Sequence, residues 1–156
     1  MDNKQEIKEK AFEFLRKQRV AALATVSASG EPHAATITII ADSDFNIYFI
    51  TKQSSRKFAD ISANPRVGLT VGFDSDHPQT IQIQGAAEIM TAERVRIMIE
   101  VEERLAEREF YWWPLMRMKG SDFAVIKITP EWARWLSLDG ELHPDTYKED
   151  FYQLIP

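Results

Sequence analysis

The chain has 156 residues, of which 44% are hydrophobic, and this length and apolar content suffice for one buried core in a single domain spanning residues 1–156. The formal net charge of −5 argues against a face for nucleic acid or for an anionic membrane, so a bound anion needs a local cluster of cations. The absence of cysteine excludes disulfides and thiol catalysis, and the wide spacing of the three histidines, His33, His77 and His143, argues against a metal site.

The N-terminal segment predicts an amphipathic helix rather than a targeting segment. Within residues 5–18, apolar side chains recur at helical spacing between charged ones; they are Ile7, Ala11, Phe14 and Leu15. No apolar run in the sequence approaches the ~20 residues that a membrane span needs. We therefore expect a soluble, cytoplasmic protein whose first helix covers one side of the core.

Six segments carry the β-branched or alternating pattern of strands; they are residues 20–27, 33–40, 47–51, 66–73, 79–90 and 122–130. The turn-rich stretch at 41–46 predicts that the second and third segments form a hairpin. Gly85 inside the fifth indicates a bulge or a close backbone approach. Strands clustered with turns between them predict an antiparallel α+β fold, and a closed or partly closed barrel would remove its exposed edges.

Two more helices are expected between these strands. One covers residues 55–63, with a serine at 54 or 55 as its N-cap and the Asn-Pro pair at 64–65 as its stop. The longest helix begins at Thr91 and leads to the aromatic loop at 110–116. The last predicted strand is followed by a tail rich in aromatic side chains, namely Trp132, Trp135, Tyr147, Phe151 and Tyr152.

Two cations stand where the helix over 55–63 begins. Arg56 and Lys57 occupy its first turn, at the end where the helix dipole is positive and where acidic side chains are favoured by about 0.3–1 kcal/mol. One interpretation is that they are solvated surface charges that pair with Asp60 or with other carboxylates. The other is a phosphate site, because a serine-capped helix start offers free N–H groups, Arg adds a bidentate fork and Lys adds a point charge.

The order of four motifs supports the phosphate site. "GEPHAATITII", "IYFIT", "SSRKFADISANPRVGL" and "QIQGAAEI" follow one another between about Val20 and Glu88. This order resembles the pyridoxamine 5′-phosphate oxidase-like superfamily of FMN-binding split β-barrels, and especially its general stress protein type. The resemblance implies a six-stranded antiparallel split β-barrel with flanking helices.

The resemblance also implies where FMN is held. The segment that matches Ser55, Arg56 and Lys57 grips the FMN phosphate in that family. Further positions match the strands that line the isoalloxazine and ribityl chain; they are Ala35, Thr36, Ile37, Thr38, Ile50 and Thr51. A polar residue on a later strand, here Thr80 or Gln82, reaches the flavin from the second subunit. The resemblance therefore implies a homodimer with flavin at its interface.

The activity implied is that of an FMN-dependent oxidoreductase acting on a small molecule, with NADH or NADPH as a transient donor because no GxGxxG motif is present. Oxidation of pyridoxamine phosphate itself is not expected, since the chain ends in "HPDTYKEDFYQLIP" instead of the basic segment that holds that substrate. A flavin-binding stress or sensor protein without turnover, or a related barrel using F420 or haem, are the alternatives.

Two features have more than one interpretation, and no catalytic acid or base is assigned. Trp113 and its neighbour Trp112 belong to a core or dimer contact or to a wall of the flavin pocket, and Pro114 fixes the chain after them. His33 follows a Gly-x-Pro turn and is either a proton donor near the flavin or an ordinary surface or core histidine.

Overall fold

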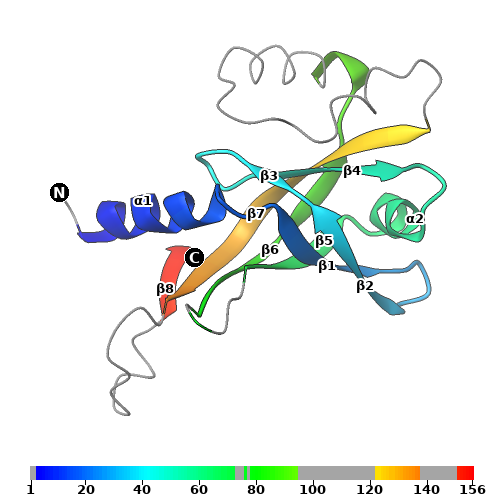
Figure 1. Ribbon diagram of the computed structural model, residues 1–156. Coiled ribbons are helices and arrows are strands. Elements are labelled where there is room, and N and C mark those ends of the chain that lie inside the picture. The colour runs from blue at the N-terminus through cyan, green and yellow to red at the C-terminus, as the bar shows by residue number, and fades with distance from the viewer. Residues whose placement is uncertain (1–2, 73–75, 77, 95–121, 138–150) are drawn as a thin grey trace.

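The structure is a computed structural model that describes residues 3–72, 76, 78–94, 122–137 and 151–156 (Figure 1). In chain order its elements are α1 (Asn3–Leu15), β1 (Val20–Val26), β2 (Pro32–Thr38), β3 (Ile40–Ala41), β4 (Ile47–Lys52), α2 (Arg56–Ala63), β5 (Arg66–Val71), β6 (Gln79–Ile89), β7 (Phe123–Ser137) and β8 (Phe151–Ile155). Neither of these helices is both long and apolar enough to cross a membrane.

The strands form one antiparallel sheet in the order β2-β1-β5-β6-β7-β4-β3, with β8 paired to β7 beside this path. The sheet curls, so that β2 and β4 contact each other although no ladder of hydrogen bonds joins them among the described residues (Figure 1). An antiparallel α+β architecture with a curled, incompletely closed sheet is therefore confirmed.

The predicted count of six strands is wrong, because the described part of the chain contains eight. One additional strand is β3, which the prediction had joined to β2, and the other is β8 in the C-terminal tail. The predicted hairpin between 33–40 and 47–51 is also wrong for most of its length, since β2 pairs with β1 and, of the segment 33–40, only Ile40 in β3 pairs with β4. The change of partner occurs at Ile39, whose N–H donates to the carbonyl of Arg19 and ends the β1–β2 ladder.

The core lies inside the curl and is covered on one side by α1 (Figure 1). Large side chains with almost no exposed surface fill it; they are Phe49, Leu15, Leu23, Ile47, Ile81, Ile83, Ile126, Ile128 and Leu154. Burial of each contributes about 1.5–3 kcal/mol relative to exposure. From α1, Ala11 and Leu15 are wholly buried, and the Phe12 ring meets the Phe45 ring edge-on at a centroid distance of 6.1 Å. The amphipathic helix that the sequence predicted is confirmed.

The two longest strands, β6 and β7, are joined through a bulge at Gly85. Their register shifts between Gln84 and Gly85, so that Gln84 pairs with Trp132 while Gly85 pairs with Pro130. A Cβ atom at Gly85 would collide with the backbone of Thr129, which is the close approach that only glycine permits. The bulge also accommodates Pro130 within a strand, and β7 therefore continues to Ser137 beyond the predicted end at residue 130.

The helix predicted from Thr91 is described only at its start. The Thr91 hydroxyl accepts a hydrogen bond from the Arg94 backbone N–H at 3.3 Å, as an N-cap does. The remainder of that helix and the aromatic loop at 110–116, with Trp112 and Trp113, lie outside the described residues.

Candidate functional site

The start of α2 is built around the Ser55 hydroxyl. Ser55 has extended backbone angles and is the N-cap, and its side chain accepts a hydrogen bond from the Phe58 N–H at 3.3 Å. The Ser55 hydroxyl also lies 2.8 Å from the hydroxyl of Thr51, a buried residue near the end of β4. These contacts fix the first turn of α2 against the strand that precedes it, and they confirm the predicted cap.

Arg56 and Lys57 project from this fixed turn. Arg56 is exposed and Lys57 is half-buried. Within the described part of the chain, neither side chain makes an ion pair or a hydrogen bond. The interpretation that they pair with Asp60 is not what the structure shows, because the hydrogen bonds to that carboxylate come from other residues. Two cations therefore stand beside the first-turn N–H groups without an ion-paired carboxylate among the described residues.

Asp60 instead faces inward from α2 and joins it to the first hairpin. Its side chain is 4% exposed, and Oδ2 accepts a hydrogen bond from the Thr25 hydroxyl at 2.7 Å and lies 2.7 Å from Nδ1 of His33. The hydrogen bonds from Thr25 and then from His33 lower the pKa of Asp60, and the more distant Arg56 charge lowers it further. Thr25 and His33 are opposite each other on β1 and β2, so one carboxylate holds both strands.

Sequence reasoning missed this cluster. It had placed His33 either near the flavin or in an ordinary environment, and it treated Asp60 as a partner for surface cations. The position of Asp60 within α2, one residue before the buried Ile61, could have indicated it. A carboxylate next to the apolar face of a helix needs hydrogen-bond donors when it is buried.

The predicted residues on β2 and β4 lie on strands that contact each other, and β4 also contacts α2. On β2, Thr36 and Thr38 are exposed, Ala35 is half-buried and Ile37 is buried, while Ile50 on β4 is half-buried. Because β2 contacts β4, and α2 contacts both β1 and β4, these residues and the start of α2 belong to one connected region. Ala35–Thr38, Ile50, Thr51 and Ser55–Lys57 therefore lie on neighbouring elements, but successive residues of β2 face opposite sides of the sheet, so that Ile37 lies in the core while Thr36 and Thr38 are exposed.

Thr80 and Gln82 are not part of that region within one chain. Both lie on β6, three strands from β2 in the sheet. Thr80 is buried and donates its hydroxyl hydrogen to the carbonyl of Val71 at 3.2 Å, whereas Gln82 lies on the outer face of the sheet and accepts a hydrogen bond from Nε of Arg134 at 2.8 Å. Trp113, the remaining predicted cofactor residue, lies outside the described residues.

Known proteins resemble this chain in sequence and in fold. The family model of pyridoxamine 5′-phosphate oxidase matches residues 7–137. General stress protein 26 of Bacillus subtilis is 27% identical over 147 residues, which cover 91% of this chain and 96% of that protein. The crystal structure of general stress protein 26 from Bacillus anthracis covers 83% of this chain and 93% of its own, with a TM-score of 0.63 and 25% identity. The resemblance indicated by the sequence motifs is confirmed.

Two more distant structures share the fold alone. The heme storage protein HutZ of Vibrio cholerae has a TM-score of 0.61 at 17% identity and covers 79% of this chain and 89% of its own. A protein named F420 reductase has a TM-score of 0.57 at 21% identity and covers 78% of this chain and 93% of its own. This architecture therefore occurs in proteins whose names refer to different cofactors.

Proposed function

The chain belongs to the pyridoxamine 5′-phosphate oxidase family, and from that premise we propose that it is an FMN-binding oxidoreductase of the general stress protein type, acting on a small molecule. The observation that carries the proposal is the start of α2. It combines a fixed serine cap, free first-turn N–H groups and two cations without an ion-pair partner among the described residues, and these are the groups that a phosphomonoester requires.

The residues present fit FMN. Ser55, Arg56 and Lys57 would hold its phosphate, with the guanidinium as a fork and the ammonium as a point charge. Residues 35–38 of β2, with Ile50 and Thr51 of β4, would line the remainder of the cofactor in the region that contacts α2. When bound, FMN would supply hydride and electron transfer, which no side chain of the protein provides. The protein's own part is to orient the cofactor and to neutralise its phosphate.

A homodimer is part of this proposal. The resemblance implies that Thr80 or Gln82 reaches the flavin from a second copy of the chain, and their place on β6, three strands from β2 in the sheet, is consistent with this. The proposed donor is NADH or NADPH, which would bind transiently, and oxidation of pyridoxamine phosphate is not proposed.

The absorption spectrum of the purified protein, with and without added FMN, tests the proposal. We expect a flavin spectrum that NADH or NADPH bleaches in the absence of oxygen. A flavin spectrum that neither donor bleaches would favour the flavin-binding stress or sensor protein. A deazaflavin spectrum or a haem band would assign the fold to the cofactors of its more distant relatives, and a protein that takes up none of these would contradict the proposal.

A further inference from the structure

Arg56 and Asp60 have the spacing of an ion pair but do not form one. The two residues are four positions apart on α2, so their side chains leave the same face of the helix. An arginine and a carboxylate at this spacing are neighbours that attract each other. Among the described residues, however, the Arg56 side chain has no ion pair and is exposed, whereas Asp60 is buried and bonded elsewhere.

Two donors on the first hairpin hold the Asp60 carboxylate. The Thr25 hydroxyl donates to Oδ2 at 2.7 Å, and Nδ1 of His33 lies 2.7 Å from the same oxygen. Because the hydrogen bonds from Thr25 and His33 lower the pKa of Asp60, its carboxylate is ionised at neutral pH, and Nδ1 of His33 is then the atom that carries the shared proton. Both donors lie on β1 and β2, so the carboxylate is bonded to the sheet and not to a cation of its own helix.

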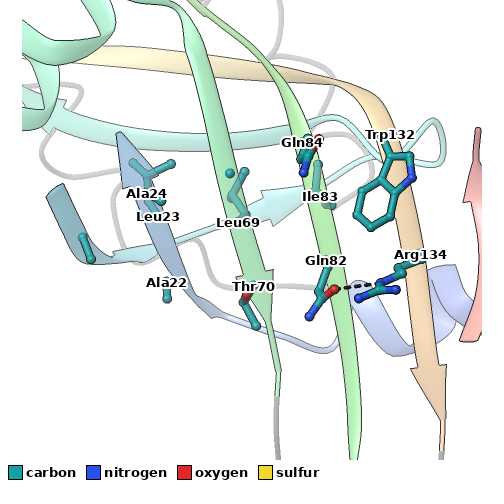
Figure 2. A pocket seen from close by; sticks show the side chains of 12 residues that line it. Ala22, Leu23, Ala24, Leu69, Thr70, Gln82, Ile83, Gln84, Trp132 and Arg134 are labelled. Atoms are coloured by element: carbon teal, nitrogen blue, oxygen red, sulfur yellow. Dashed lines mark hydrogen bonds between the residues drawn. The ribbon is translucent and has the colours of Figure 1, made fainter. Parts of the chain in front are cut away.

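A second arginine shows that a cation can also be kept from carboxylates by neutral groups. The Nε of Arg134 donates to Gln82 Oε1 at 2.8 Å, and the guanidinium carbon lies 5.4 Å from the centroid of the Trp132 ring (Figure 2). Arg56 has no such neutral partner within the described ranges. Whether its guanidinium is free for a ligand therefore depends on where the Asp60 carboxylate is held.

We infer that Thr25 and His33 are positioning residues for the phosphate site at the start of α2. By holding the Asp60 carboxylate, they leave the Arg56 guanidinium free for a phosphomonoester. This role rests on the proposed function, because it concerns the same phosphate. A carboxylate on Arg56 would occupy the N–H groups of the fork and cancel its charge, and the phosphate would have to displace it. Neither positioning residue has to touch the ligand, since both act through Asp60.

Removal of one donor should make Asp60 change its partner. In His33→Phe the carboxylate keeps only the bond from Thr25, and a buried carboxylate that lacks a donor is costly. The cation on the same face of its helix is Arg56, and an ion pair between the two would compete with the phosphate. We expect FMN to bind His33→Phe about three- to tenfold more weakly than wild type, a smaller loss than removal of the guanidinium would cause. Riboflavin, which has no phosphate, should bind both proteins alike.

Flavin fluorescence quenching with the full-length protein at neutral pH measures these affinities, and two variants serve as controls. His33→Asn places an amide N–H₂ group near the position of Nδ1, so it should keep the affinity for FMN. Tyr48→Phe removes a hydroxyl that donates to a different carboxylate, that of Asp42, at 2.9 Å. It should leave FMN binding unchanged, because Asp42 does not belong to α2.

Two double variants distinguish positioning from a general loss of structure. Asp60→Asn should bind FMN at least as tightly as wild type, and His33→Phe combined with Asp60→Asn should regain this affinity, because a neutral amide does not neutralise Arg56. In an Arg56→Ala background, His33→Phe should have no further effect on FMN, since the group that Asp60 would occupy is gone. A purely structural role of His33 would give neither result, because a second substitution would not restore a damaged fold.

Several outcomes would overturn the role of the two donors. Full FMN affinity in folded His33→Phe would do so, as would a double variant with Asp60→Asn that binds FMN as weakly as His33→Phe alone. If His33→Phe does not fold, Thr25→Val removes the other donor and should weaken FMN in the same way. The two proposals fail differently: if wild type binds FMN and riboflavin alike, the phosphate site is wrong, and if wild type prefers FMN and the donor variants keep the full preference, only the role of Thr25 and His33 is wrong.

Discussion

Removal of either cation at the start of α2 should weaken FMN binding without weakening the fold. In Arg56→Ala and in Lys57→Ala, a charge-assisted contact to phosphate is lost, at a cost of about 1.5–3 kcal/mol each, or roughly ten- to a hundredfold in affinity. Folding should change little, because neither side chain makes an ion pair or hydrogen bond among the described residues, and the helix cap belongs to Ser55. At this end of the helix dipole, removal of a cation would even relieve about 0.3–1 kcal/mol of repulsion.

Quenching of flavin fluorescence measures the affinities, with riboflavin and Arg66→Ala as controls. Riboflavin lacks the phosphate, so it should bind wild type much more weakly than FMN and be nearly indifferent to both substitutions. Arg66 follows the other end of α2, its side chain is 74% exposed and, among the described residues, its ion pair is with Glu131 at the surface, so its loss should not change FMN affinity. If both variants kept full FMN affinity, and FMN and riboflavin bound wild type alike, Arg56 and Lys57 would be solvated charges and the phosphate site would be wrong.

Three further predictions concern assembly, acid stability and the sheet. Sedimentation at micromolar concentration should show a dimer, and a monomer that binds FMN tightly would contradict the two-copy site. Because the hydrogen bonds from Thr25 and His33 lower the pKa of Asp60, its contribution to stability is present above its ordinary value of 3.8 and is lost as the pH falls through the lower, folded value. Urea unfolding should therefore show a smaller acid-dependent loss of stability in Asp60→Asn than in wild type, and equal losses would refute the linkage. Gly85→Val should destabilise the protein by about 1–3 kcal/mol or more through its backbone collision, whereas Gly68→Ala, where a Cβ meets only ordinary contacts, should be near neutral in the same urea assay.

Local chemistry in the sequence was sufficient to predict α2 and its N-cap. The serine, the Asn-Pro stop and the apolar Ile61 act within one helix, so their effect does not depend on which strands pair. The role of Gly85 was predictable for the same reason, because a glycine inside an alternating strand usually marks a bulge or a close backbone approach.

Strand partners were less predictable, because pairing is decided across the sheet. The segment 33–40 is β-branched without interruption from Thr36 to Ile40, and nothing within it shows that Thr38 pairs with Val20 while Ile40 pairs with Tyr48. The strand β8 was missed because its pairing with β7 depends on the continuation of β7 past Pro130, and a proline within a pattern normally ends a strand.

The two sets of cations illustrate why the candidate site was only partly predictable. Arg56 and Lys57 were recognised because local sequence alone shows that they are unusual. They are cations at a helix N-terminus, where acidic side chains are favoured. Arg134 shows no such oddity in sequence, since its environment comes from Gln82 on β6 and Phe151 on β8, residues 52 and 17 positions away along the chain that only the sheet brings beside it. In a chain of net charge −5, both sets lack a carboxylate partner among the described residues, although acidic side chains outnumber basic ones. The buried Asp60 contributes to this at α2, because hydrogen bonds from Thr25 and His33 satisfy its charge and leave the cations of the same helix available for an anion from outside.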